Sequence, residues 1–172
     1  ELTLFEIMVA KTYDQEKNFD LALKYEMLID SGNSEKDLKH AGYETIPSST
    51  ILQCMASYLI KDIKRKSILK LDKAEFIESW PIVKDSIFHA IDFFRSQYRI
   101  PVSRLLPYPA LLVPFTYFYL NNNNNPPNPL QIKLLTQYFW WTSLSGRFSS
   151  GVESKLAQDF KKIDKIINGE IP

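Results

Sequence analysis

The chain has 172 residues with a formal net charge of +1 and 45% hydrophobic content, which suits one globular domain with its own core. Its single cysteine, Cys54, excludes an internal disulfide framework and fits a reducing compartment, and only 5 glycines argue against a turn-rich β-sandwich. The most apolar run, residues 110–120, is shorter than the roughly 20 residues that a membrane-spanning helix needs. We therefore expect a cytoplasmic protein, and the start at Glu1 suggests an internal piece of a larger one.

Helix signals begin at the first residues of the chain. Thr3 and Glu6 form a capping-box pattern, which predicts a helix that ends near residue 13. A second helix is expected over residues 18–30, and a third begins after Pro47. The apolar positions of the third helix are spaced 3, 4 and 4 residues apart: Leu52, Met55, Leu59 and Ile63.

The middle of the chain contains two prolines that complicate the helix pattern. Asp72 and Glu75 form another capping-box pattern, and we expect Pro81 to end that helix or to start the next one. The helix after it has a stripe at 4, 4, 3 and 4 residues: Val83, Ile87, Ile91, Phe94 and Tyr98. The following apolar helix begins either at Pro109, in which case Pro114 kinks it, or nearer Leu111.

Two further helices are predicted after an asparagine- and proline-rich loop over residues 121–129. The helix over 129–144 is apolar on several sides, so we expect it to be the most buried element. The last helix begins at a capping-box pattern, Ser150 to Glu153, and ends near residue 168. We expect the following side chains to be mostly buried: Ile91, Phe94, Leu112, Phe139, Trp140, Trp141 and Phe160.

These patterns predict an all-α fold, an irregular bundle of about six to eight helices forming a single domain over residues 1–172. The sequence contains no glycine-rich phosphate loop, zinc-ligand spacing or nucleophile elbow. Asp85, His89 and Asp92 share one helix face that would suit a metal ion, but we interpret them as a solvated row of polar side chains, because the sequence places no further ligand near them. We interpret Cys54 as a small buried apolar residue. We therefore assign no catalytic, cofactor-binding or metal-binding residue.

The charge is unevenly distributed along the chain. Residues 93–152 contain five basic residues and no acidic one. This stretch is either the buried centre of the domain or a surface that meets phosphates. The candidate contacts with nucleic acid or with a neighbouring domain are Arg95, Arg99, Arg104, Arg147, Ser149, Ser150 and Lys155.

The serine-rich segment before the last helix is the strongest of these candidates. Arg147 and Lys155 flank a predicted helix N-terminus, where free backbone N–H groups favour an anion. The alternative is that Ser149 and Ser150 only cap the helix and that Arg147 pairs with a neighbour.

This segment also resembles a signature of the DUF262 family. Residues 140–150, with the sequence WWTSLSGRFSS, are followed by Glu153, Lys155, Leu156 and Asp159, as in the helical part of that family. Residues 2–11 are similar to the segment that follows the Asn-x-Gly-Gly-type motif of that family, and residues 90–94 and 105–108 also match its helical region. The resemblance covers essentially the whole chain.

The resemblance implies a role in a modification-dependent restriction or antiphage protein. In that family a ParB-like catalytic domain with an Asp-Gly-Gln-Gln-Arg motif comes first, and a His-Asn-His nuclease domain often follows. Neither motif occurs here, so no catalytic residue can be assigned by resemblance. The implied function is a helical scaffold that contacts neighbouring domains and DNA within an NTP-dependent nuclease. The alternative is a helical protein–protein interaction module unrelated to nucleic acid.

Overall fold

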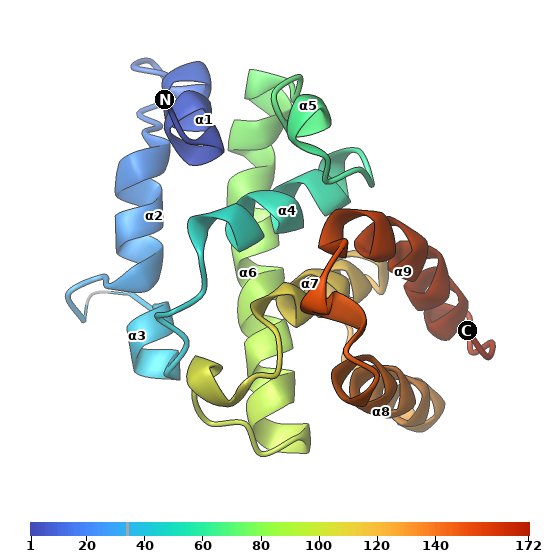
Figure 1. Cartoon of the computed structure of the whole chain (residues 1–172). Coiled ribbons are helices and arrows are strands. Elements are labelled where there is room, and N and C mark those ends of the chain that lie inside the picture. Colours follow the sequence, from blue (N-terminus) through green and yellow to red (C-terminus); the bar gives the residue numbers. More distant parts are fainter. Residues whose placement is uncertain (34) are drawn as a thin grey trace.

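The computed structural model describes every residue except residue 34, and the described residues form helices and no strand (Figure 1). The only β-type pairing among them is an isolated bridge between Asp14 and Phe19. The nine α-helices are α1 (Leu4–Thr12), α2 (Leu21–Ile29), α3 (Leu38–Ala41), α4 (Ser48–Leu59), α5 (Arg65–Ile68), α6 (Lys73–Gln97), α7 (Leu112–Asn121), α8 (Pro129–Leu144) and α9 (Val152–Ile167). The all-α prediction is confirmed. The number exceeds the expected six to eight because it includes two short helices, α3 and α5, of 4 residues each.

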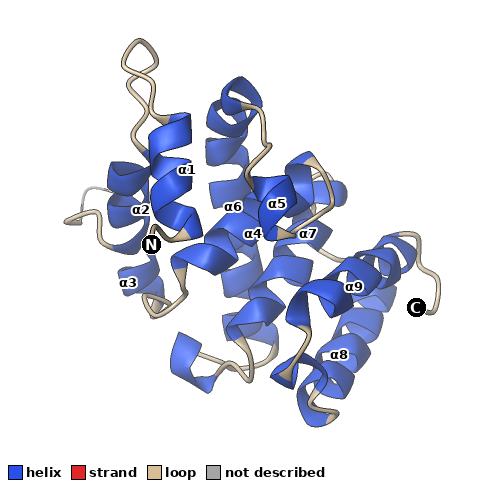
Figure 2. Cartoon of the chain, turned by 45° about the horizontal axis from the view of Figure 1, so that its top comes forward, coloured by secondary structure: helices blue, strands red, loops and turns tan. Residues whose placement is uncertain are grey.

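The helix α6 runs through the centre of the molecule, and the other helices are arranged around it (Figure 1). The helix α7 packs against α6, α4 and α9. In both views, α1 to α3 lie on one side of the molecule and α8 and α9 on the other (Figure 2). No helix of the described residues has the length and apolar character needed to cross a membrane.

The prediction that Pro81 ends a helix is wrong, because α6 continues through it for 25 residues. Pro81 is exposed, while Trp80 and Val83 on either side of it are buried in the core. A proline removes one backbone hydrogen bond, and burial of the neighbouring apolar side chains compensates for that loss.

The most buried helix is α7 and not α8, contrary to our expectation. Every residue from Leu112 to Tyr119 is buried. A 3₁₀ turn over Pro109–Leu111 precedes the helix, so Pro114 lies in the first α-helical turn. The N–H groups of that turn have no partner within the helix, so this proline removes no helical hydrogen bond.

Trp140 and Trp141 are not buried, which corrects another prediction. Their exposed fractions are 47% and 53%, whereas Phe139 beside them is fully buried. The ring of Phe139 packs against Phe94 and Phe115, with centroids 5.9 Å and 6.0 Å away. The helix α8 has apolar residues on several sides, but only one of those sides faces the core. The remaining expected core residues, Ile91, Phe94, Leu112 and Phe160, are buried as predicted.

The carboxylate of Asp37 fixes the turn between α2 and α3. It is buried and accepts hydrogen bonds from the backbone N–H groups of His40 and Ser31, at 2.7 Å and 2.8 Å. The Ser31 hydroxyl and the His40 ring also contact it, at 3.0 Å and 2.8 Å. These donors stabilise the charged form, led by the two backbone N–H groups, and hold the pKa of Asp37 well below its usual range.

We expect the loss of this charge to destabilise the protein in acid. A carboxylate with a lowered folded-state pKa stabilises the fold fully above its unfolded-state pKa of about 4. That contribution is lost as the pH falls from there toward the folded-state pKa. The free energy of unfolding, measured by urea titration, should therefore decline below about pH 4, and Asp37→Asn should flatten the decline.

Asp85→Asn provides a matched control, since Asp85 is an exposed carboxylate on α6. This variant should keep the pH profile of the unchanged chain. An Asp37→Asn profile that runs parallel to that of the unchanged chain would contradict the role assigned to Asp37.

Candidate functional site

Arg147 lies in a short 3₁₀ turn, Arg147–Ser149, between α8 and α9, and its guanidinium binds the carboxylate of Asp159. Its Nη2 donates to Oδ1 of Asp159 at 2.7 Å, and its Nε lies 3.1 Å and 3.2 Å from the two carboxylate oxygens. The side chain of Asp159 is 0% exposed and that of Arg147 only 14%. The pair is therefore a buried, two-point ion pair between the turn and α9.

Two other side chains complete the surroundings of Asp159. The Tyr138 hydroxyl of α8 donates to Oδ2 at 2.7 Å, and the Lys162 ammonium lies 3.7 Å from Oδ1. Burial, together with the nearby negative charge of Asp159, raises the pKa of Tyr138 well above its usual value. Tyr138 therefore remains a hydrogen-bond donor, and Asp159 joins α8, the 3₁₀ turn and α9.

The remaining contacts of Arg147 are also internal. Nη2 donates to Oε1 of Gln158 at 3.0 Å, and the guanidinium carbon lies 5.5 Å from the ring centre of Trp141. Lys162 lies over the same ring at 4.5 Å. These contacts agree with the alternative in which Arg147 pairs with a neighbour.

The serine-rich turn satisfies its own polar groups as well. Ser149 donates to the Gly146 carbonyl at 2.7 Å, and the Lys155 ammonium donates to the Ser150 carbonyl at 2.6 Å. The predicted capping box at Ser150 is wrong, because Gly151 precedes α9 and no side chain caps it. Gly151 has a φ of +60°, and the preceding residue is extended, so the Ser150 side chain does not occupy the capping position.

The three other predicted contact residues lie elsewhere. Arg95 is in the last turn of α6, Arg99 follows that helix, and Arg104 lies in a 3₁₀ turn, Ser103–Leu105. All three are exposed, and none forms an ion pair or hydrogen bond within the described part of the chain. The candidate set thus divides into an internally bonded group around α9 and three exposed arginines after α6.

A feature that sequence reasoning missed is the exposed face of α8. Trp140, Trp141 and Leu144 are 47%, 53% and 81% exposed, and we call these three residues the α8 face. The helix has no acidic residue, and its one basic residue, Lys133, is exposed. The sequence could have indicated this face, because α8 is apolar on several sides and a surface helix buries only one of them.

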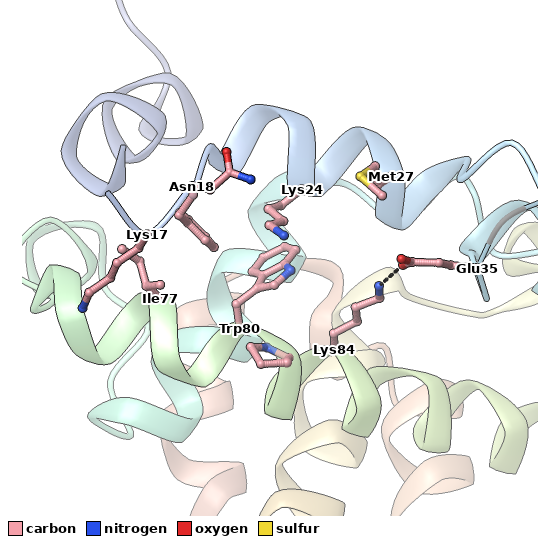
Figure 3. Close-up of a pocket in the computed structure, with 10 residues that line it drawn as sticks. Lys17, Asn18, Lys24, Met27, Glu35, Ile77, Trp80 and Lys84 are labelled. Atoms are coloured by element: carbon pink, nitrogen blue, oxygen red, sulfur yellow. Dashed lines mark hydrogen bonds and ion pairs between the residues drawn. The ribbon is translucent and has the colours of Figure 1, made fainter. Parts of the chain in front are cut away.

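A hollow of about 280 Å³ lies between α2 and α6 (Figure 3). Phe19 and Trp80 form its buried part, while Lys24 of α2 and Lys84 of α6 lie at its rim. The Lys84 ammonium pairs with Glu35 at 3.2 Å.

The other polar candidates form separate local contacts. The ring of His89 stacks on Tyr119 with centroids 5.4 Å apart, and Asp92 pairs with Lys36 at 3.1 Å. Within the described residues, no group of three or more His, Cys, Asp or Glu side chains could hold a metal ion. Cys54 is fully buried, as predicted, and burial raises the pKa of its thiol to about 12.

Comparison with known proteins gives one distant relative. The chain is 24% identical, over 180 aligned residues, to the uncharacterized protein MJ0686 of Methanocaldococcus jannaschii. The alignment covers 100% of this chain but 30% of that protein, so the chain spans less than a third of its relative's length. No protein-family model matches the chain, and no solved structure matches it.

We expect Arg147→Ala to destabilise the protein by about 3–5 kcal/mol, because it leaves a buried carboxylate without its main partner. Arg147→Leu combined with Asp159→Leu should be less destabilising, since it removes the unpaired charge as well. Urea denaturation measures these changes, and Arg104→Ala, at an exposed arginine, should stay within about 0.5 kcal/mol of the unchanged chain.

Binding of double-stranded DNA at low salt, measured on the same variants, separates the two interpretations of Arg147. A loss of DNA affinity in Arg147→Ala without any loss of stability would contradict the structural role and favour the anion site.

Proposed function

We propose that this chain is a helical scaffold domain that binds a neighbouring protein domain through the α8 face. The observation that carries this proposal is the exposure of Trp140, Trp141 and Leu144 on a helix whose opposite side is buried. Tryptophan is enriched among the residues that dominate protein interfaces, and covering such side chains removes apolar surface from water.

The charge around this face indicates which kind of surface would bind it. The Lys162 ammonium lies over the ring of Trp141, and α8 carries no carboxylate. A partner surface with an apolar centre and acidic residues at its edge would complement this arrangement.

Within this proposal, we take the partner to be the ParB-like domain that the resemblance to the DUF262 family implies. The signature segment begins at Trp140 and Trp141, and its arginine and aspartate, Arg147 and Asp159, join the serine turn to α9. The length of the distant relative supports the presence of neighbouring domains, because the matched region is only 30% of that protein.

In this proposal the chemistry belongs to other domains of a restriction or antiphage protein of the cytoplasm. Such a protein would be an NTP-dependent nuclease, and this domain would hold its enzymatic parts in place. Any contact with DNA would fall to Arg95, Arg99 and Arg104, which are exposed.

We expect Leu144→Asp to weaken binding of the ParB-like domain encoded beside this chain by at least about tenfold, because it introduces a charge into an apolar contact. Isothermal titration calorimetry measures the affinity. Leu144 is 81% exposed, so the melting temperature should stay unchanged. Leu23→Asp, at a 56% exposed leucine of α2, provides the matched control and should bind normally.

Two results would argue against the proposal. A gene without a ParB-like segment beside this chain would remove the DUF262 assignment and favour an unrelated interaction module. Equal affinity of the Leu144→Asp variant and the unchanged chain for the ParB-like domain would show that α8 is not the binding face.

A further inference from the structure

The helices α2 and α8 lie on opposite sides of the molecule (Figures 1 and 2), and the hollow is lined by residues of α2 and α6 and by none of α8. A ligand in this hollow would therefore bind independently of the α8 face and of the proposed function.

The deepest part of the hollow is aromatic. Phe19 and Trp80 meet edge to face with ring centroids 6.2 Å apart, and they are only 4% and 6% exposed. Met27 of α2, 41% exposed, and Ile77 of α6 form apolar walls. This arrangement provides a rigid surface on which one bulky apolar side chain can rest.

The rim of the hollow is positively charged. Lys17, Lys24 and Lys84 line it, whereas Glu35 is its only acidic lining residue. Lys24 is partly buried and has no ion pair within the described part of the chain, and Figure 3 shows it directed into the hollow from α2. An ammonium without an ion pair next to an aromatic floor favours a ligand that carries both a carboxylate and an apolar group.

Glu35 already shows how a carboxylate binds at this rim. It lies in the connection between α2 and α3, and its side chain, 52% exposed, pairs with Lys84 at 3.2 Å (Figure 3). A second hollow of about 210 Å³ lies on the other side of this ion pair and shares both residues with the first. An incoming carboxylate that replaced Glu35 at Lys84 would join the two hollows.

The joined groove would follow α6 from Ile77 to His89. Its second part adds Lys36 and Asp85 to the lining, so lysines still outnumber carboxylates. Twelve helical residues rise roughly 18 Å, which is the length of about five residues of extended chain. That shape suits a linear peptide better than a compact small molecule.

The geometry points to a binding site for a short acidic peptide segment, whose bulky apolar side chain rests on Trp80 and whose carboxylate replaces Glu35 at Lys84.

The test uses the 172-residue chain and the synthetic peptide acetyl-Glu-Glu-Phe-Glu-Glu-amide. Titration is followed by the indole N–H signals in ¹H–¹⁵N NMR spectra, which Trp140→Phe and Trp141→Phe variants assign among the three tryptophans. We expect a saturable shift of the Trp80 signal that weakens with added salt. The peptides acetyl-Lys-Lys-Phe-Lys-Lys-amide and acetyl-Glu-Glu-Gly-Glu-Glu-amide should produce no such shift, because each lacks one of the two recognised features.

Three variants of the chain test which charges contribute to peptide binding. Lys24→Gln keeps most of the side chain but removes its charge, and it should weaken binding about fivefold. Glu35→Gln removes the competing carboxylate and should strengthen binding about threefold. Lys161→Gln, at an exposed lysine of α9, provides the matched control and should leave the affinity unchanged.

Several outcomes would overturn the inference. These are the absence of a saturable Trp80 shift, an equal shift with the lysine peptide, or an affinity that Lys24→Gln and Lys161→Gln lower by the same factor. A shift confined to Trp140 and Trp141 would also overturn it and would assign the acidic peptide to the α8 face.

Discussion

The burial of Asp159 determines how the C-terminal half of the molecule is arranged. A buried carboxylate must be paired, and Arg147 and Tyr138 supply the partners from the 3₁₀ turn and from α8. The bond to Tyr138 also fixes the rotation of α8 about its axis. Successive residues of a helix are about 100° apart, so a Tyr138 that faces Asp159 places Trp140 about 200° away, toward solvent. The exposure of Trp140 and of Leu144, which lies about 240° from Tyr138, therefore follows from the same interaction that buries Asp159. Trp141 lies only about 60° from Tyr138, and Arg147 and Lys162 lie over its ring.

The helices were predictable from sequence wherever capping patterns and apolar stripes agreed. Thr3 and Glu6 form the predicted capping box, and α8 and α9 begin and end close to the expected residues. Pro81 was mispredicted because local rules describe the hydrogen bond that a proline removes but not the packing around it. The burial of Trp140 and Trp141 was mispredicted because the apolar character of a side chain does not show whether its side of the helix faces the core.

The acid-free stretch over residues 93–152 shows why the candidate site was harder to predict than the fold. Part of its composition reflects burial, since α7 lies wholly within it and is buried from Leu112 to Tyr119. Another part reflects pairing across its boundary, since Arg147 binds Asp159, which lies outside the stretch. The exposed side chains of Arg95, Arg99, Arg104 and Lys133 remain as uncompensated charge. Sequence alone could not separate these three causes, because the partners of a side chain are set by tertiary contacts.

The placement of the signature residues also limits what the family resemblance can mean. Arg147 and Asp159 pair with each other, Ser149 binds the Gly146 carbonyl, and Lys155 binds the Ser150 carbonyl. Each of these contacts stabilises the turn between α8 and α9, and each is made within the chain. These residues therefore explain the conformation of the turn. They do not indicate what the domain binds. In our proposals, binding is therefore carried by other surfaces: the α8 face, which adjoins this turn, and the groove along α6, which lies apart from it.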